Sequence, residues 1–203
     1  MTVSQSAPLR LYLIRHGETE WSLSGQHTGR TEVALTARGE AGARELAPIL
    51  GAITFARVLT SPRRRAQRTC ELAGLGQAAE IEPDLAEWDY GDYEGLRSAD
   101  IQKQRPDWSI FQDGCPHGET PIQISDRADR LLTRLRGQGG AIALFSHGHF
   151  GRVLAARWIG LPVVEGQHFA LGVASLGILG FEANHPDTPV IALWNFTPSE
   201  WSA

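Results

Sequence analysis

The fold is decided by the stretch LRLYLIRHGET, residues 9–19, in which an apolar run from Leu9 to Ile14 stops abruptly at Arg15. A short apolar run followed by polar residues and glycine is typical of a buried strand that ends in a loop. Residues 56–60 and 141–145 repeat this pattern, and polar residues again follow at once. These runs therefore predict three buried strands.

Helical patterns lie between the strands. One helix is expected from Thr36 to near Gly51, and another from Thr120, where Gln123 can complete a capping box. A third is expected to open at Ser61-Pro62, with the serine as N-cap and the proline at the first helical position. A fourth is expected to follow the 141–145 run and to extend through residue 159, whereas residues 15–35 and 84–118 are expected to be largely loop.

Residues 172–181 and 189–195 predict two more strands. Strands and helices thus alternate along the chain. The sequence therefore predicts an α/β fold, a single domain over residues 1–203 with a mostly parallel central sheet flanked by helices on both faces.

Composition excludes several classes of protein. The chain has 203 residues, of which 42% are hydrophobic and 21% charged, and this excludes a disordered or fibrous chain. A net charge of −4 disfavours a nucleic-acid binder, and no apolar run approaches the ~20 residues of a membrane-spanning helix. The first ten residues carry no secretory signal, so we expect a cytoplasmic protein that binds neither nucleic acid nor membrane.

The predicted strand ends carry unusual residues. They are RHGET at 15–19, TSPRRR at 60–65 and SHGH at 146–149. In open α/β sheets, ligands bind beyond the carboxyl ends of the strands, so these segments are expected to meet at one rim. An imidazole can attack phosphorus if one nitrogen is free of its proton, so His16 and His147 indicate phosphoryl chemistry.

The arginines after the second strand have two interpretations. Arg63, Arg64, Arg65 and Arg68 can simply form a solvated face. However, positive side chains in the first turn of a helix oppose its dipole unless an anion is held there. Arg15 ends a neighbouring strand, so we expect at least one of the four to neutralise phosphoryl oxygens with it.

A proton donor for the leaving group is expected from the acidic loop EWDYGDYEG, residues 87–95. Acidic runs are usually exposed loops, but the interleaved aromatic residues favour a pocket wall. Neither Cys70 nor Cys115 is followed by the arginine of a cysteine phosphatase, and no Walker motif occurs. His147 and His149 without a third ligand are weak evidence for a metal, so we expect a metal-free site with no cofactor.

The segment RHGET at 15–19 resembles the signature of the histidine phosphatase superfamily, in the branch that includes cofactor-dependent phosphoglycerate mutases. Further segments match in order at residues 28–39, 60–69 and 146–148, so the resemblance covers nearly the whole chain. It implies a phosphoglycerate mutase-like fold and a single histidine phosphatase domain. Within the family, the stretches 21–22, 25–29, 87–95 and 113–120 are similar to the sedoheptulose-1,7-bisphosphatase group.

The resemblance also implies roles for individual residues. His16 is the expected nucleophile, which becomes phosphohistidine. Glu87 is the expected general acid, and then the base that activates water. Arg15, Arg65 and His147 are expected to hold the phosphoryl oxygens. Further contacts to the substrate or its phosphate are expected from Ser22, Thr28, Gly29, Tyr90 and Gly148.

The leading hypothesis is a metal-independent phosphomonoesterase whose partner is a small phosphorylated metabolite, with sugar phosphates and bisphosphates as the expected class. A cofactor-dependent phosphoglycerate mutase is the alternative, although Ser22 stands where mutases typically carry an asparagine. A non-catalytic module that binds phosphorylated ligands is a third hypothesis. It would need a missing nucleophile or acid, and both are present.

The C-terminal aromatic residues leave a question of assembly open. Trp194, Phe196 and Trp201 can cap the sheet or form a homodimer contact, and the sequence does not separate the two.

Overall fold

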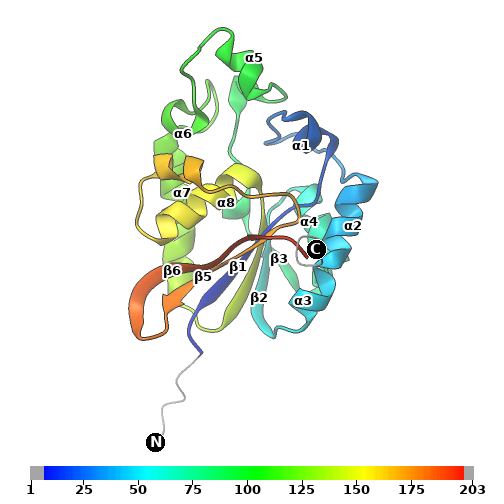
Figure 1. Cartoon of the computed structure of the whole chain (residues 1–203), viewed down its shortest axis with the longest axis vertical. Coiled ribbons are helices and arrows are strands. Elements are labelled where there is room, and N and C mark those ends of the chain that lie inside the picture. Colours follow the sequence, from blue (N-terminus) through cyan, green and yellow to red (C-terminus); the bar gives the residue numbers. More distant parts are fainter. Residues whose placement is uncertain (1–6, 199–203) are drawn as a thin grey trace, which may run out of the picture.

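The computed structural model describes residues 7–198. Its centre is a six-stranded sheet in the order β3-β2-β4-β1-β5-β6 (Figure 1). The strands β3, β2, β4 and β1 run parallel, and β5 and β6 are antiparallel to their neighbours. The mostly parallel sheet is thus confirmed. The strands are β1 (Arg10–Arg15), β2 (Phe55–Thr60), β3 (Ala79–Ile81), β4 (Ala141–Ser146), β5 (Leu176–Glu182) and β6 (His185–Phe196).

Helices cover both faces of this sheet, as predicted (Figure 1). The helices are α1 (Glu20–Ser24), α2 (Ala37–Glu45), α3 (Ala47–Gly51), α4 (Arg64–Leu72), α5 (Ser98–Gln102), α6 (Ile110–Asp113), α7 (Pro121–Arg136) and α8 (Gly148–Trp158). Short 3-10 helices lie at Gly76–Ala78, Pro83–Leu85, Gly91–Tyr93 and Val163–His168. Among residues 7–198 no helix is long and apolar enough to cross a membrane.

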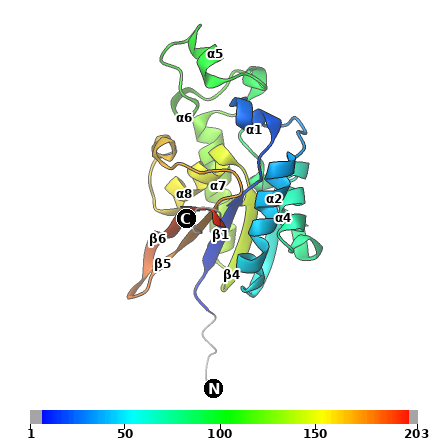
Figure 2. The same ribbon diagram turned by 45° about the vertical axis from the view of Figure 1, so that its right-hand side comes forward.

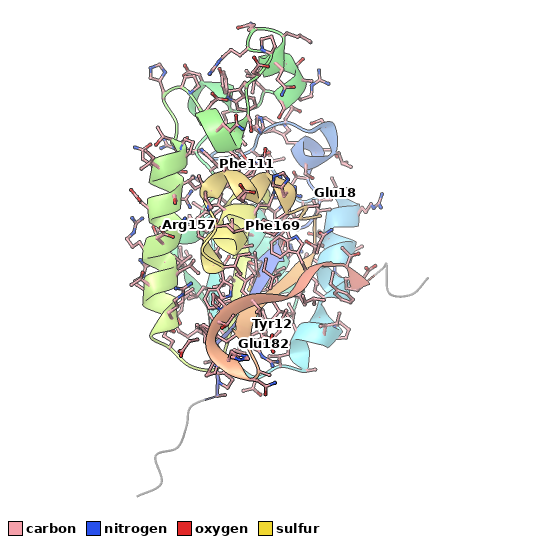
Figure 3. The ribbon with its side chains drawn as sticks, turned by 60° about the vertical axis from the view of Figure 1, so that its left-hand side comes forward. Tyr12, Glu18, Phe111, Arg157, Phe169 and Glu182 are labelled. Atoms are coloured by element: carbon pink, nitrogen blue, oxygen red, sulfur yellow. The ribbon has the colours of Figure 1, made fainter. Side chains whose placement is uncertain are left out.

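The sheet separates two hydrophobic cores, and each strand contributes alternate side chains to them. Successive side chains of a strand point to opposite faces. Leu11 and Leu13 of β1 therefore join the core beneath α7 and α8, whereas Tyr12 and Ile14 join the core beneath α2, α3 and α4. Figure 3 shows α7 and α8 side by side against the sheet. The two cores fix the sheet between its helices, and so fix the direction of every strand end.

The predicted helix from Thr36 is in fact two helices. Thr36 is the N-cap, with its side chain accepting a hydrogen bond from the backbone N–H of Gly39 at 2.9 Å. The chain then breaks at Leu46 and restarts as α3, with Pro48 in its first turn. Proline has no N–H for the preceding turn, and its ring crowds the carbonyl four residues back, so one continuous helix was a wrong prediction.

The predicted start of α4 was also wrong. The helix begins at Arg64, and its N-cap, Arg63, makes no side-chain cap bond. Ser61 lies before the helix, where its Oγ is 2.7 Å from Nε2 of His147 and accepts the N–H of Arg63 at 3.2 Å. The serine hydroxyl therefore links the ends of β2 and β4 and does not cap the helix. By contrast, the capping box of Thr120 and Gln123 at the start of α7 is confirmed.

Two smaller differences lie in segments predicted from weak patterns. Residues 15–35, expected to be loop, contain α1, which is capped by Thr19 and Ser22. The strand expected from residue 172 begins at Leu176, because Ala174 adopts a positive φ of 50° and its N–H bonds the carbonyl of His16. The preceding residues thus close over the end of β1 instead of extending β5.

The C-terminal aromatic residues divide between the two cores. Trp194 packs against the core beneath α7 and α8, and Phe196 against the opposite core. Both therefore cover the sheet. Trp201 lies outside the described residues, and the homodimer contact stays a prediction.

Candidate active site

The carboxyl ends of β1, β4 and β2 meet at one rim. Arg15 and Ser146 are paired in the parallel register, and the N–H of His16 bonds the carbonyl of Ser146 at 3.0 Å. The N–H of Ser61 bonds the carbonyl of Phe145 at 2.9 Å. Helices α1, α5 and α6 lie beyond this end of the sheet (Figure 2). The predicted strand-end residues are thus brought together.

His16 is buried and held in one orientation. Its Nδ1 lies 2.7 Å from the carbonyl oxygen of Gly17, which can only accept a hydrogen bond, so Nδ1 is the protonated nitrogen. Burial lowers the pKa of His16 well below its usual 6.5, and the charges of Arg65 and Arg15 lower it further. At neutral pH the ring is therefore neutral, and Nε2 keeps a free lone pair.

Gly17 explains how the loop after β1 is held. A Cβ added to it would lie 2.4 Å from the carbonyl oxygen of Gly39, so the two backbones touch as no other residue would allow. Its N–H donates to Oγ1 of Thr69 on α4 at 3.0 Å. The chain around His16 is thus anchored to both α2 and α4.

Arg65 is a buried cation that forms no ion pair with a carboxylate among residues 7–198. Its side chain is 1% exposed, and its Nη atoms donate to the carbonyl oxygens of Thr28, Gly29 and Thr31 at 2.7–3.0 Å. Burial lowers its pKa, while the nearby Glu87 raises it. A guanidinium stays charged in proteins, so this side chain brings an uncompensated positive charge to the rim.

Arg15 is held in a similar way. Its Nη1 donates to the carbonyl oxygen of Leu171, and its Nε has no hydrogen-bond partner in the described part of the chain. Burial lowers the pKa of Arg15 as well, and Glu87 opposes that effect. The half-buried Arg15 and the buried Arg65 lie close to one carboxylate, so they leave an excess of positive charge.

His147 lies beside His16, with ring centroids 5.2 Å apart. It is fully buried, and its Nε2 is 2.7 Å from Oγ of Ser61. Burial lowers its pKa well below the usual value, and the charge of Arg65 contributes. We call Arg15, His16, Arg65 and His147 the strand-end cluster.

Unpartnered buried atoms concentrate at this rim. Within residues 7–198 they are Nε of Arg15, Arg63 and Arg65, Nδ1 of His147, and Oγ1 of Thr197. Buried polar atoms without a partner are rare, and each calls for a physical reason. Four nitrogens from adjacent strand ends, together with the excess positive charge, fit a site that takes an anion with several oxygens.

Glu87 is the acidic side chain that faces the cluster. Its Oε1 accepts the N–H groups of Trp88 and Phe150 at 2.9 and 2.8 Å, and its Oε2 accepts the N–H of His149 at 3.1 Å. Two of these donors belong to the first turn of α8, so the loop is pinned to the helix that follows His147. Oε2 accepts one hydrogen bond and Oε1 accepts two, so Oε2 is the more available of the two oxygens.

A cavity of about 200 Å³ opens in front of these residues. Seven of the residues expected to form the site line it, namely Arg15, His16, Ser22, Thr28, Glu87, Tyr90 and Gly148. Arg65, His147 and Gly29 do not line it but lie behind. The N–H of Gly29 donates to Glu94 and its carbonyl accepts from Arg65, so both of its backbone polar groups are already hydrogen-bonded within the protein. The hydroxyl of Ser22 donates to the carbonyl of Thr19 at 2.8 Å, and its phosphate contact stays a prediction.

Several lining residues had no predicted role. We call them the outer wall: Trp21, Gln26, His27, Ser98, His149 and Arg152. His149 and Arg152 are three residues apart on α8, which places them on one face of the helix. That spacing was visible in the sequence, but nothing there showed that this face looks into the site.

The outer wall is joined by aromatic and hydrogen-bond contacts. The ring of His27 stacks on Tyr90 with centroids 4.6 Å apart, and the Tyr90 hydroxyl is 2.7 Å from Nδ1 of His149. Burial lowers the pKa of His27 to about 4 and that of His149 well below its usual value. It raises the pKa of Tyr90 well above 10. All three side chains are therefore neutral at neutral pH.

Neither cysteine is placed to act as a nucleophile. Burial raises the thiol pKa of both Cys70 and Cys115 to about 12, so neither is a thiolate at neutral pH. Among residues 7–198 no group of three or more His, Cys, Asp and Glu side chains is arranged to hold a metal ion. That a metal has no part in the reaction stays a prediction.

Comparison with known proteins gives one family. The model of the histidine phosphatase superfamily (branch 1) matches residues 11–197. An acid phosphatase of Mycobacterium tuberculosis is 46% identical over 188 residues, which is 91% of this chain and 92% of that protein. The sedoheptulose 1,7-bisphosphatase of Saccharomyces cerevisiae is 36% identical over 187 residues, with 76% of this chain and 69% of that protein covered.

A solved structure supports the same relationship. The structure of an open reading frame from Mycobacterium tuberculosis superimposes with a TM-score of 0.87 and 42% sequence identity. The match covers 93% of this chain and 98% of that one. The strand-end cluster therefore lies in a fold that is shared over almost its whole length.

Proposed function

The chain belongs to the histidine phosphatase superfamily, and from that premise we propose that it is a metal-independent phosphomonoesterase acting through a phosphohistidine on His16. Its expected substrates are small phosphorylated metabolites, with sugar phosphates and bisphosphates as the expected class. The observation that carries the proposal is a neutral His16 with a free Nε2, set beside the half-buried Arg15 and the buried Arg65, neither of which forms an ion pair with a carboxylate of residues 7–198.

The first half of the proposed reaction transfers the phosphoryl group. The Nε2 lone pair of His16 attacks phosphorus, and the bond from phosphorus to the ester oxygen breaks. Glu87 gives its proton to that oxygen, so the product leaves as a neutral alcohol. Arg15 and Arg65 balance the charge of the equatorial oxygens, and His147 donates a hydrogen bond to one of them.

The second half returns the enzyme to its starting state. Glu87, now ionised, takes a proton from water as the water oxygen attacks phosphorus. The phosphorus–nitrogen bond breaks, its electron pair returns to Nε2, and inorganic phosphate leaves. The hydrogen bond from Nδ1 to the Gly17 carbonyl keeps the proton on the far nitrogen throughout, so Nε2 is ready for the next turnover.

The compact cavity supports small substrates. Its volume of about 200 Å³ is below the roughly 300–1,000 Å³ usual for drug-sized ligands. The acid phosphatase and sugar bisphosphatase relatives support hydrolysis as the outcome. The cytoplasmic location and the homodimer stay predictions.

The proposal is tested by phosphate release from sugar monophosphates, sugar bisphosphates and phosphoglycerates, with EDTA present throughout. Release that persists in EDTA, with an acid-labile phosphoryl group trapped on His16, is the expected result. Isomerised phosphoglycerate formed with a bisphosphoglycerate primer, without free phosphate, would indicate a mutase instead. Binding without any turnover would indicate a non-catalytic module.

A further inference from the structure

Arg152 is a cation of the outer wall that the proposed reaction does not use. It lies on α8, one turn beyond the residues that hold Glu87, and it lines the cavity. The strand-end cluster supplies the charges for one phosphoryl group, so a further arginine in the same cavity needs a separate reason.

The guanidinium of Arg152 is held rigidly. Its Nε donates to the carbonyl oxygen of Gly166 at 2.9 Å, and its Nη2 donates to that of Gln167 at 2.7 Å. Its central carbon lies 4.7 Å from the ring centroid of Phe111, a residue labelled in Figure 3. Backbone carbonyls and a ring face thus fix the group while leaving its full charge uncompensated.

One side of this group is free. Within residues 7–198 its Nη1 makes no hydrogen bond, and no carboxylate forms an ion pair with Arg152. Burial lowers the pKa of Arg152, with Glu87 and Tyr90 opposing the effect and Arg15 adding to it. The side chain remains a cation, because a guanidinium is not deprotonated in proteins.

The other members of the outer wall carry no positive charge. His27 and His149 are neutral at neutral pH, and Trp21, Gln26 and Ser98 have no charge to offer. Arg97 and Lys103, which flank α5 on either side, are paired with Asp100 instead. An anionic group on the leaving-group side of a substrate would therefore find its counter-charge at Arg152.

We propose that Arg152 determines specificity by binding a second anionic group, a phosphate or a carboxylate, on the leaving-group side of a small phosphomonoester. This rests on the proposed phosphatase function. The neutral polar residues His27, Gln26 and Ser98 would face the hydroxylated carbon chain between the two charged ends. The free Nη1, prepositioned by two carbonyls, costs little side-chain ordering when the anion binds.

The test compares substrates that differ in the second anionic group alone. The carboxylate pair is 3-phosphoglycerate and glycerol 3-phosphate. The phosphate set is fructose 1,6-bisphosphate against fructose 1-phosphate and fructose 6-phosphate. The wild-type enzyme is expected to favour the member with two anionic groups, and the pair with the larger ratio identifies the group that Arg152 prefers.

The variants are Arg152→Gln, Arg152→Lys and, as a matched control on the same helix, Arg157→Gln. Arg157, also labelled in Figure 3, pairs with Asp129 at 2.8 Å and does not line the cavity. Arg152→Gln should lower kcat/KM for the doubly anionic members by about 10- to 100-fold, the usual value of hydrogen bonds between charged groups. The singly anionic members should change by less than about threefold, and Arg152→Lys should restore part of the ratio.

Equal losses for both members of each pair would overturn the inference, because Arg152 would then only support the Gly166–Gln167 segment. Unchanged ratios in Arg152→Gln would overturn it as well. If Arg152→Gln fails to fold, the ratios of Arg152→Lys decide, since that variant keeps the charge but loses the planar fork. The Arg157→Gln enzyme should keep the wild-type ratios.

Failure of the proposed phosphatase function can be distinguished from failure of the inference about Arg152. If the wild-type protein releases phosphate from none of these compounds, the phosphatase proposal fails. Thermal stabilisation by 3-phosphoglycerate against glycerol 3-phosphate then tests Arg152 by binding alone. Greater stabilisation by 3-phosphoglycerate in the wild type, lost in Arg152→Gln, supports the inference, and equal stabilisation by the two ligands overturns it.

Discussion

The strand-end cluster and the outer wall meet at one cavity, which Arg15 and His16 of the cluster line, but the two regions are built differently. Members of the cluster lie at the ends of strands or the starts of helices. Backbone carbonyls hold Arg15, His16 and Arg65, and the hydroxyl of Ser61 holds His147. The outer wall comes from α1, α5, α8 and the loop around residue 27, and ring stacking and side-chain bonds join it. A site can thus place its chemistry on the sheet and its selectivity on the surrounding segments.

The charges differ in the same way. The cluster combines neutral histidines with permanently charged arginines, whereas the outer wall contains neutral side chains apart from Arg152. Substitutions in the cluster should therefore act on the chemical step. Those in the outer wall should act on the choice and affinity of the substrate.

The largest effect is expected from His16→Ala. Without Nε2 no phosphohistidine can form, and kcat should fall by roughly four orders of magnitude or more. The measurement is phosphate release from the best substrate, with circular dichroism to check the fold. If more than a tenth of the rate survives, His16 is not the nucleophile and the contrast between the two regions fails.

Glu87→Gln should cost about 10²- to 10⁴-fold in kcat, because the leaving oxygen loses its proton donor. The amide cannot titrate, so the alkaline limb of the pH–rate profile should change as well. A substrate with a good leaving group, such as p-nitrophenyl phosphate, needs little protonation and should lose less. An equal loss for both substrates would argue against a role for Glu87 as general acid.

Tyr90→Phe should sharpen the comparison, because it removes the contact with His149 and leaves the cluster intact. The lost hydrogen bond predicts a rise in KM with a smaller change in kcat, and a stability loss of about 1 kcal/mol. Steady-state kinetics and urea unfolding check this. A large fall in kcat alone would show that Tyr90 acts in the chemical step, as the cluster does.

The smallest effect concerns His27 and pH. Its pKa is about 4 in the folded protein and near 6.5 when unfolded, so the unfolded chain binds more protons between these values. Above pH 6.5 the ring is neutral in both states, so stability does not depend on its protonation there. As the pH falls from 6.5 toward 4, proton uptake by the unfolded chain lowers the free energy of unfolding by up to about 1.4 kcal/mol per pH unit. His27→Gln removes this proton uptake, so the free energy of unfolding should vary less between pH 7 and pH 5. Urea unfolding at the two pH values measures the difference. An unchanged slope would contradict the burial of a neutral imidazole.

Much of the fold was predictable because the buried strands leave a local signal. Apolar runs such as residues 9–14 have no other stable place than the interior of a covered sheet, and helix caps such as Thr120 need only nearby residues. The start of α4 was mispredicted because Ser61 has the local properties of an N-cap. A histidine 86 residues away engages it instead.

The sequence by itself determined the parallel strands and the residues that end them, because the carboxyl ends of parallel strands necessarily share a rim. Tertiary structure decided the rest. It set the neutral state of His16 through burial beside two arginines, and it turned His27 and Arg152 into the cavity. These properties depend on contacts between segments far apart in the chain, and no periodicity or local motif encodes a contact of that kind.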